Sequence, residues 1–230
     1  MSAGLCLALA TVAFVGSHLL MSHPLRAGLV ARLGELGFLG VYSLVSLVTF
    51  GAMIWAYRAG DSDSPRWVLP LEAWPIASAV MLVASILLVG SLIRNPALPH
   101  PGARVTEIPP PKGVFAITRH PMNMSFTLWA LIHIAVSGND RNLIVAAGIL
   151  VLAVAGSVGQ DRKKLKLIGE PWARWLERTS FVPFGALASG RIRWRDSVPH
   201  WVAIVGGLVL WAVATSLHVP LVSPIGDLLS

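Results

Sequence analysis

The chain has one cysteine, Cys6, and few charged side chains. A single cysteine excludes a disulfide framework, a thiolate metal cluster and a CxxC redox pair within one chain. Charged residues make up 13% of the 230 positions, whereas about 25% is usual for a soluble domain. This shortage of charge excludes an ordinary soluble domain and indicates an apolar surrounding.

Long uncharged runs recur along the chain. A helix needs roughly 20 apolar residues to cross a hydrocarbon core of about 30 Å. Six runs approach or reach that length: residues 3–21, 38–57, 74–93, 121–137, 143–159 and 200–220. The first run has no basic stretch before it, unlike a signal peptide, so we expect it to be retained. The sequence predicts an all-α, polytopic membrane helix bundle forming a single domain over residues 1–230, with about six transmembrane helices.

The basic residues are unevenly placed. The formal net charge is +7, and fifteen of the eighteen Lys and Arg residues follow the first, third and fifth runs. The positive-inside rule predicts that these loops are cytoplasmic and that both termini lie on the other side. The basic excess then serves topology and contact with anionic lipid headgroups. We therefore expect membrane lipids as partners and no nucleic acid.

Two loops between the runs carry a pattern of their own. Residues 95–111 are rich in proline, which disfavours helix and keeps the chain extended. Residues 161–183 predict a basic amphipathic helix with Trp172 and Trp175 on its apolar side. Such a helix is typical of the membrane interface. We expect Gly169-Glu170-Pro171 to break it in two.

Ionisable side chains occur at the mouth and inside of the apolar runs. Arg119-His120-Pro121 opens the run that contains His133, and His18 lies within the first run. Such groups are costly in lipid and usually mark a ligand, ion or proton site. The alternative for each buried histidine is a structural role, with the ring bonded to a backbone carbonyl.

Neutral imidazole is a common metal ligand and a haem axial ligand. His120 and His133 are 13 positions apart, or about 20 Å along a helix, so one regular helix cannot bring both to one iron. A haem would need ligands from different helices, with His18 as the donor from the first run. At the cytoplasmic level, Arg119 is a candidate partner for Asp161.

Several ordered motifs resemble a known family. They are Gly16-Ser17-His18-Leu19-Leu20, Pro24-Leu25-Arg26, Gly34-Glu35, Tyr42-Ser43-Leu44, Gly113 to Pro121, Leu128 to His133, Gly138-Asn139-Asp140, Asp161-Arg162-Lys163, Arg178-Thr179-Ser180 and Pro183-Phe184. Together, over about residues 10–187, they resemble the NnrU family of bacterial membrane proteins. The helix expected at about residues 200–220 lies beyond these motifs.

The resemblance implies a cofactor and a cellular role. NnrU proteins are associated with denitrification and nitric oxide metabolism and are similar to 15-cis-zeta-carotene isomerase, a membrane enzyme with haem b. Its proposed haem-ligating histidines fall on His18 and His133, and the Arg-His-Pro histidine falls on His120. The isomerase has a cysteine where this chain has Ala130, so a ligand switch that uses that cysteine is absent here.

The iron-ligating pair has two readings. The predicted topology puts His18 near the cytoplasmic end of its helix and His133 towards the other side. His18 and His120 are expected at more similar depths in the membrane, so one haem could bind both more easily. The family resemblance instead implies His18 and His133 as the ligands. We keep both pairs and expect the cofactor-binding residues to be His18, His133, His120 and Arg119.

The sequence therefore predicts a multi-pass protein of the bacterial cytoplasmic (inner) membrane that binds haem b. It would act in nitric oxide metabolism, or isomerise a conjugated lipid such as cis-zeta-carotene in a redox-dependent way. Its small-molecule ligand would be a hydrophobic polyene or nitric oxide. No residue is assigned as catalytic, and no oligomeric state is predicted.

Two other functions stay open. The first is a membrane methyltransferase similar to the isoprenylcysteine carboxyl methyltransferase group. In that case Arg119, His120 and Glu170 would contact S-adenosylmethionine near the cytoplasmic interface. The second is a non-catalytic membrane assembly factor, which would leave the buried histidines unexplained.

Overall fold

The computed structural model describes residues 2–60, 64–98 and 106–222, with side chains described as far as residue 217. Its helices are α1 (Ala3–Ser22), α2 (Arg26–Ala59), α3 (Trp74–Gly90), α4 (Val114–Ile117), α5 (Pro121–Val136), α6 (Asp140–Ile168), α7 (Glu170–Arg178), α8 (Gly185–Ala188) and α9 (Trp201–Val222), with 3-10 turns at Leu71–Ala73 and Trp194–Ser197. In this part of the chain, extended pairing is limited to an isolated bridge between Val68 and Ser137. The all-α fold is confirmed.

Four helical segments are long and apolar enough to cross a membrane: Ala3–Ser22, Arg26–Ala59, Leu71–Gly90 and Asp140–Ile168. The helices at Pro121–Val136 and Trp201–Leu217 are apolar but shorter. These six segments coincide with the six predicted runs. The protein is a polytopic helical membrane protein.

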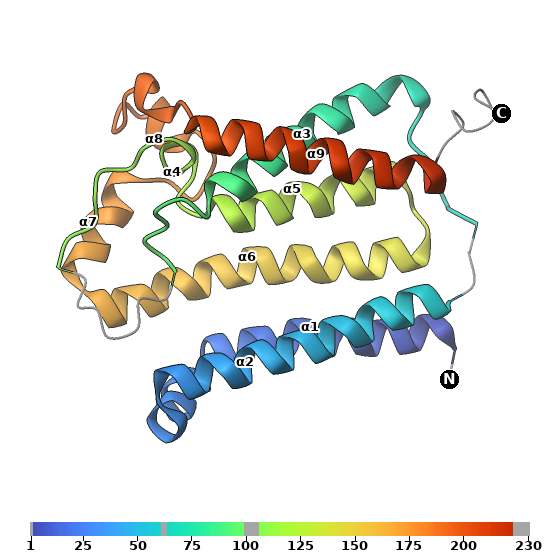
Figure 1. The fold of residues 1–230 in the computed structure, drawn as a ribbon, viewed down its shortest axis with the longest axis horizontal. Helices are drawn as coiled ribbons and strands as arrows, with labels where there is room; N and C mark the ends of the chain where they lie inside the picture. Colours follow the sequence, from blue (N-terminus) through green and yellow to red (C-terminus); the bar gives the residue numbers. More distant parts are fainter. Residues whose placement is uncertain (1, 61–63, 99–105, 223–230) are drawn as a thin grey trace.

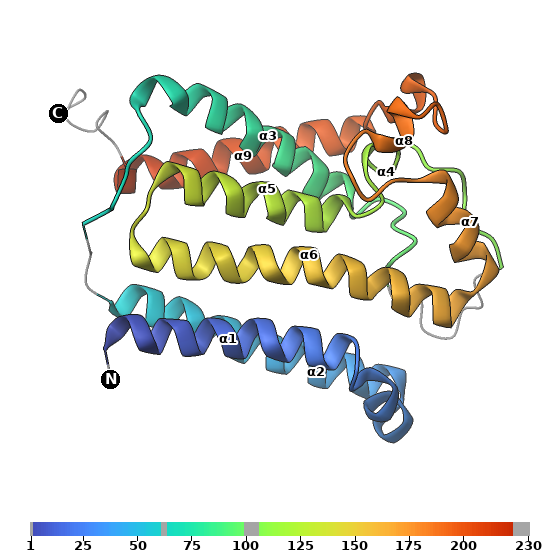
Figure 2. The same ribbon diagram turned by 180° about the vertical axis from the view of Figure 1, so that it is seen from behind.

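The six long helices pack in the spatial order α2, α1, α6, α5, α3 and α9 (Figures 1 and 2). The start of α1 and the C-terminal part of α9 lie on the same side of the bundle (Figure 1). Which of the two ends faces the cytoplasm stays a prediction from the distribution of basic residues.

Helix α6 fixes the positions of α1 and α5 along the bundle. Thr11 of α1 contacts α6 at Gly148, and His23, just after α1, contacts it at Gly159. The residue numbers of these contacts increase in the same direction along both helices, so α1 and α6 run parallel. On the other side, the side-chain amide of Asn123 in α5 donates a hydrogen bond to the Ser157 hydroxyl, at 2.8 Å. Since α5 and α6 are joined by a short turn, they run antiparallel.

The amphipathic segment is divided as predicted. Helix α6 ends before Gly169, whose φ of 72° lies in the left-handed region that favours glycine. The chain then starts α7. Trp172 and Trp175 are buried in a cluster with Leu87 and Phe115, so the apolar side of α7 covers protein core. At 29 residues, α6 is about 43 Å long, which exceeds a hydrocarbon core of about 30 Å.

Helix α9 packs on α3 through a glycine that has no room for a side chain. A Cβ added at Gly207 would lie 2.7 Å from the Cα of Ile86 and 2.8 Å from its backbone nitrogen. Because backbone atoms cannot move aside easily, we expect Gly207→Ala to lower the free energy of unfolding by about 1–3 kcal/mol through overpacking. Thermal unfolding in detergent measures this.

Gly51 provides the matched control, since it is helical and a Cβ there would meet no atom within 4 Å. Gly51→Ala should leave stability unchanged or raise it, because alanine is the better helix former. Equal melting temperatures for the two variants would contradict this close packing of α9 on α3.

Candidate functional site

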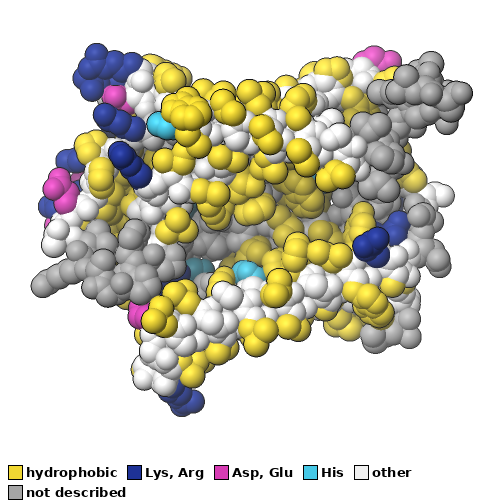
Figure 3. Space-filling view, viewed as in Figure 1, with side chains coloured by type: hydrophobic (Ala, Val, Ile, Leu, Met, Phe, Trp, Pro, Cys, Tyr) yellow, Lys and Arg dark blue, Asp and Glu magenta, His cyan; other side chains and the backbone are white. Residues whose placement is uncertain are grey.

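One face of the bundle is hollowed. Figure 3 shows the hollow between α3 and α9 on one side and α2 on the other, bordered by hydrophobic side chains, with histidine side chains at its edge. Helices α2, α3 and α9 carry many exposed large apolar residues, among them Leu47, Ile76 and Leu208. An apolar surface of this kind suits contact with lipid or another apolar molecule.

His18 is half-buried on α1 and is held by its own helix. Its Nδ1 lies 3.1 Å from the carbonyl oxygen of Phe14. The Phe14 ring packs against the imidazole at 4.4 Å between centroids, and Tyr42 of α2 approaches it edge-on at 5.3 Å. Two aromatic rings and one hydrogen bond therefore fix the orientation of this imidazole.

His133 is held in the same way on α5. Its Nδ1 lies 2.8 Å from the carbonyl oxygen of Trp129, and its ring stacks on the Trp129 indole at 4.1 Å between centroids. A carbonyl oxygen only accepts hydrogen bonds, so in both histidines Nδ1 carries the proton. The lone pair then resides on Nε2, which is the form of imidazole that binds a metal.

The two carbonyl groups that hold the imidazoles lie at a similar depth in the bundle. Phe14 is three residues beyond the α1 contact at Gly148, and Trp129 is six residues beyond the α5 contact at Ser157. Counting along parallel α1 and antiparallel α5, both carbonyls fall level with about position 151 of α6.

The Cα atoms of His18 and His133 are further apart in depth, by about eight residues of α6 or roughly 12 Å. Side chains on a helix lean towards its N-terminus. Because α1 and α5 run in opposite directions, the two rings lean towards each other. The two rings are therefore closer in depth than their Cα atoms are.

His120 lies in a different environment, between the start of α5 and the end of α6. Its Nε2 is 2.9 Å from Oδ1 of Asp161, and its Nδ1 is 3.1 Å from Oε1 of Gln160. The side chain is nearly fully buried. Both ring nitrogens are therefore engaged by protein side chains, which leaves neither turned towards the hollow as a metal ligand would be.

Arg119 shares the same carboxylate. Its Nε donates to Oδ2 of Asp161 at 2.8 Å, which confirms the pairing expected from the sequence. The guanidinium also lies over the Phe181 ring, at 5.9 Å from its centroid. Asp161 therefore joins Arg119 and His120 into one buried network that ties the start of α5 to the end of α6.

The methyltransferase alternative needs these side chains for a cofactor. Arg119 and His120 are instead engaged by Asp161, and Glu170 pairs with Arg174 on the exposed side of α7. Sequence reasoning missed Gln160 altogether. The signal that could have identified Gln160 is its position next to Asp161, which was already a candidate partner of Arg119. Within the described residues, no cluster of three or more His, Cys, Asp or Glu side chains could hold a metal by itself.

Fold and site together define a polytopic helical membrane protein with an apolar groove and two imidazoles whose orientation is fixed by their own helices. The family model "NnrU protein" matches residues 6–224, a stretch that includes α9. The chain belongs to the NnrU family.

Two curated relatives carry the name 15-cis-zeta-carotene isomerase, chloroplastic. The proteins from Zea mays and Arabidopsis thaliana are each 33% identical to this chain over 79 residues, which is 34% of this chain and 22% of each relative. The chain therefore spans only about a fifth of the length of these relatives. No solved structure matches the chain significantly.

The Asp161 network yields a test of stability. Asp161→Asn removes the charge that two cationic or donor groups share, so we expect a loss of about 3 kcal/mol in the free energy of unfolding. Glu170→Gln is the control, because its pair with Arg174 is exposed and is worth at most about 0.5 kcal/mol. Equal unfolding midpoints in detergent would contradict a stabilising role for the network.

Proposed function

We propose that this protein binds haem b in the hollowed face, with His18 and His133 as its axial ligands, and isomerises a conjugated apolar molecule. The carrying observation is that each Nδ1 is bonded to the carbonyl four residues earlier in its own helix, on two helices that both pack against α6. In this tautomer the lone pair of each imidazole is on Nε2, and the two imidazoles belong to different helices. A haem held by two histidines needs two such donors and no larger cluster.

The residues around the two histidines suit this role. Phe14 and Tyr42 hold the first imidazole, and Trp129 holds the second. Fixing the tautomer and ring plane of a ligand raises its affinity for a metal. Bound haem would supply a one-electron couple that can lend electron density to a conjugated chain.

The substrate class follows from the groove and from the relatives. The groove is bordered by apolar side chains (Figure 3), which favour a lipid-like molecule over a polar metabolite. The names of the two plant relatives refer to a cis-carotene isomerase. We propose a cis-polyene as substrate and the bacterial cytoplasmic membrane as location. A role in nitric oxide metabolism is the alternative for the same haem, and no side chain favours it.

His120 has a positioning role in this proposal. Its ring nitrogens are bonded to Gln160 and Asp161, so it orients the start of α5, the helix that carries His133. The pair His18–His120, which was open at the level of sequence, is disfavoured for this reason.

The test is a reduced-minus-oxidised absorption spectrum of protein purified in detergent from haem-replete cells. We expect a b-type signal at one haem per chain. His18→Ala and His133→Ala should each remove most of it, because each deletes an axial ligand.

The controls separate ligation from folding. His200 lies just before α9, where its Nδ1 accepts a hydrogen bond from the Val202 backbone, so His200→Ala should leave the signal intact. His120→Ala should retain haem in the fraction of the protein that folds. A colourless wild-type protein, or loss of haem only in the His120 variant, would contradict the proposal.

A further inference from the structure

The turn between α5 and α6 holds the end of the helix that carries His133. Its motif, Gly138-Asn139-Asp140, has no part in the proposed haem site. His133 lies in the last turn of α5, which ends at Val136. The last four carbonyls of a helix have no partner within that helix, and the membrane interior provides no water to bond them. The position of His133 therefore depends on what lies beyond the end of α5.

Asn142, in the first turn of α6, supplies donors to this helix end. Its side-chain amide donates hydrogen bonds to the carbonyl oxygens of His133 and Ser137, the second at 2.7 Å. Because both partners are carbonyls, the group that faces them is the NH₂ of the amide. The backbone N–H of Asn142 donates to Oδ1 of Asn139, the N-cap of α6, at 2.8 Å. The start of α6 thus fixes Asn142, and Asn142 fixes the end of α5.

The connection between α2 and α3 bonds the same helix end. The Trp67 indole N–H donates to the carbonyl of Ile134 at 3.1 Å, and the Leu69 N–H donates to that of Val136 at 2.8 Å. The Trp67 ring lies so close to Gly138 that a Cβ there would have no room. Together with the amide described above, these bonds satisfy three of the last four carbonyls of α5 from outside the helix.

Arg141, next to Asn142, caps a different helix. Its guanidinium donates to the carbonyls of Tyr57 and Gly60 at the end of α2, at 3.2 Å and 2.8 Å. Two consecutive side chains of one turn therefore hold the ends of two helices. Arg141 caps the helix without His133, which makes it the natural comparison for Asn142.

We propose that Asn142 is a positioning residue for His133, setting where the end of α5 lies relative to α6. The inference rests on the proposed haem site, since it is there that His133 is a ligand. Asn142 acts through the main chain, because its amide binds the carbonyl of His133, whereas Trp129 holds the imidazole. Loss of a residue that orients a metal ligand typically costs about 10–100-fold in metal affinity.

Histidine NMR signals of the haem-free full chain, labelled with ¹³C-histidine and purified in detergent, test the positioning. The His133 ring signals, identified by their absence from His133→Ala, should shift in Asn142→Ala because the end of α5 loses two hydrogen bonds. Asn142→Asp keeps the size of the side chain but lacks the NH₂ group, so it should shift them as well. The His18 signals should stay in place in both variants.

The chain purified with haem gives the second readout. In Asn142→Ala we expect haem to dissociate about ten-fold faster and part of the low-spin ferric signal to become high-spin. An unchanged spin state and dissociation rate would overturn the role of Asn142 in haem ligation. A colourless wild type would instead remove the haem proposal, while the histidine signals would still decide whether Asn142 positions His133.

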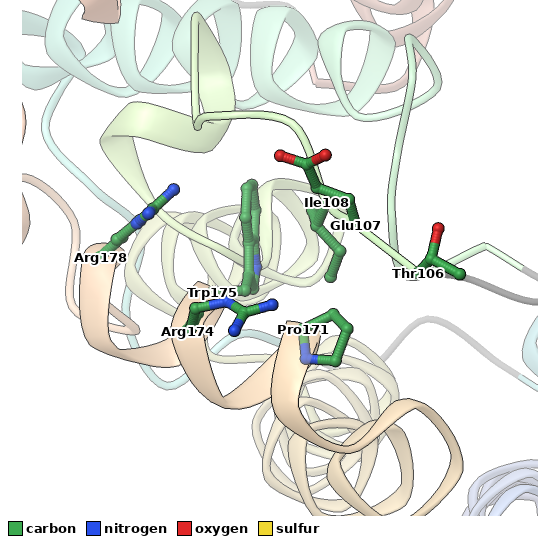
Figure 4. A pocket seen from close by; sticks show the side chains of 7 residues that line it. All are labelled: Thr106, Glu107, Ile108, Pro171, Arg174, Trp175 and Arg178. Atoms are coloured by element: carbon green, nitrogen blue, oxygen red, sulfur yellow. The ribbon is translucent and has the colours of Figure 1, made fainter.

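Two controls separate positioning from general destabilisation. Arg141→Met is the matched control, since it removes the cap of α2 from the same turn and keeps the aliphatic length. Arg178→Gln is the remote control, because Arg178 lines a cavity beside α7 (Figure 4), at the opposite end of the bundle (Figure 1). Both should leave the His133 signals in place. The proposal is overturned if neither Asn142 variant moves them, or if Arg141→Met moves them equally.

Discussion

The register of α1 and α5 on α6 is the constraint on which the candidate site depends. Gly148 lets Thr11 approach α6 closely, and Asn123 is hydrogen-bonded to Ser157. These contacts fix how far each helix is displaced along the bundle. A shift of one helical turn, about 5.4 Å, would move one imidazole away from the level of the other. Packing of small and polar residues in α6 therefore determines whether two distant histidines can serve one ligand.

The three candidate histidines are distinguished by what their ring nitrogens contact. His18 and His133 are each bonded at Nδ1 to a carbonyl of their own helix, so a lone pair resides on Nε2. His120 has oxygen acceptors at both nitrogens. The first two are arranged as ligands need to be, and the third as a buried structural donor. One residue type thus serves two purposes because its neighbours differ.

Much of the architecture could be predicted from the sequence, because uncharged runs of sufficient length must be helices in a membrane. The break at Gly169 and the Arg119–Asp161 pair were also predictable, from backbone preference and charge. The depth of the imidazoles could not be predicted, since it depends on how far α1 and α5 are displaced along α6, which the contacts at Gly148 and Ser157 determine. The contact of Gln160 with His120 and the burial of Trp175 against protein depend on packing between segments far apart in sequence.

The central claim is that His18 and His133 ligate one haem from two helices. The most direct measurement is the low-temperature electron paramagnetic resonance spectrum of the ferric, detergent-purified protein. The account predicts a low-spin bis-imidazole signal that becomes high-spin, or disappears, when either histidine is replaced by alanine. A low-spin signal that survives in both variants would contradict it, as would one that depends on His120 alone.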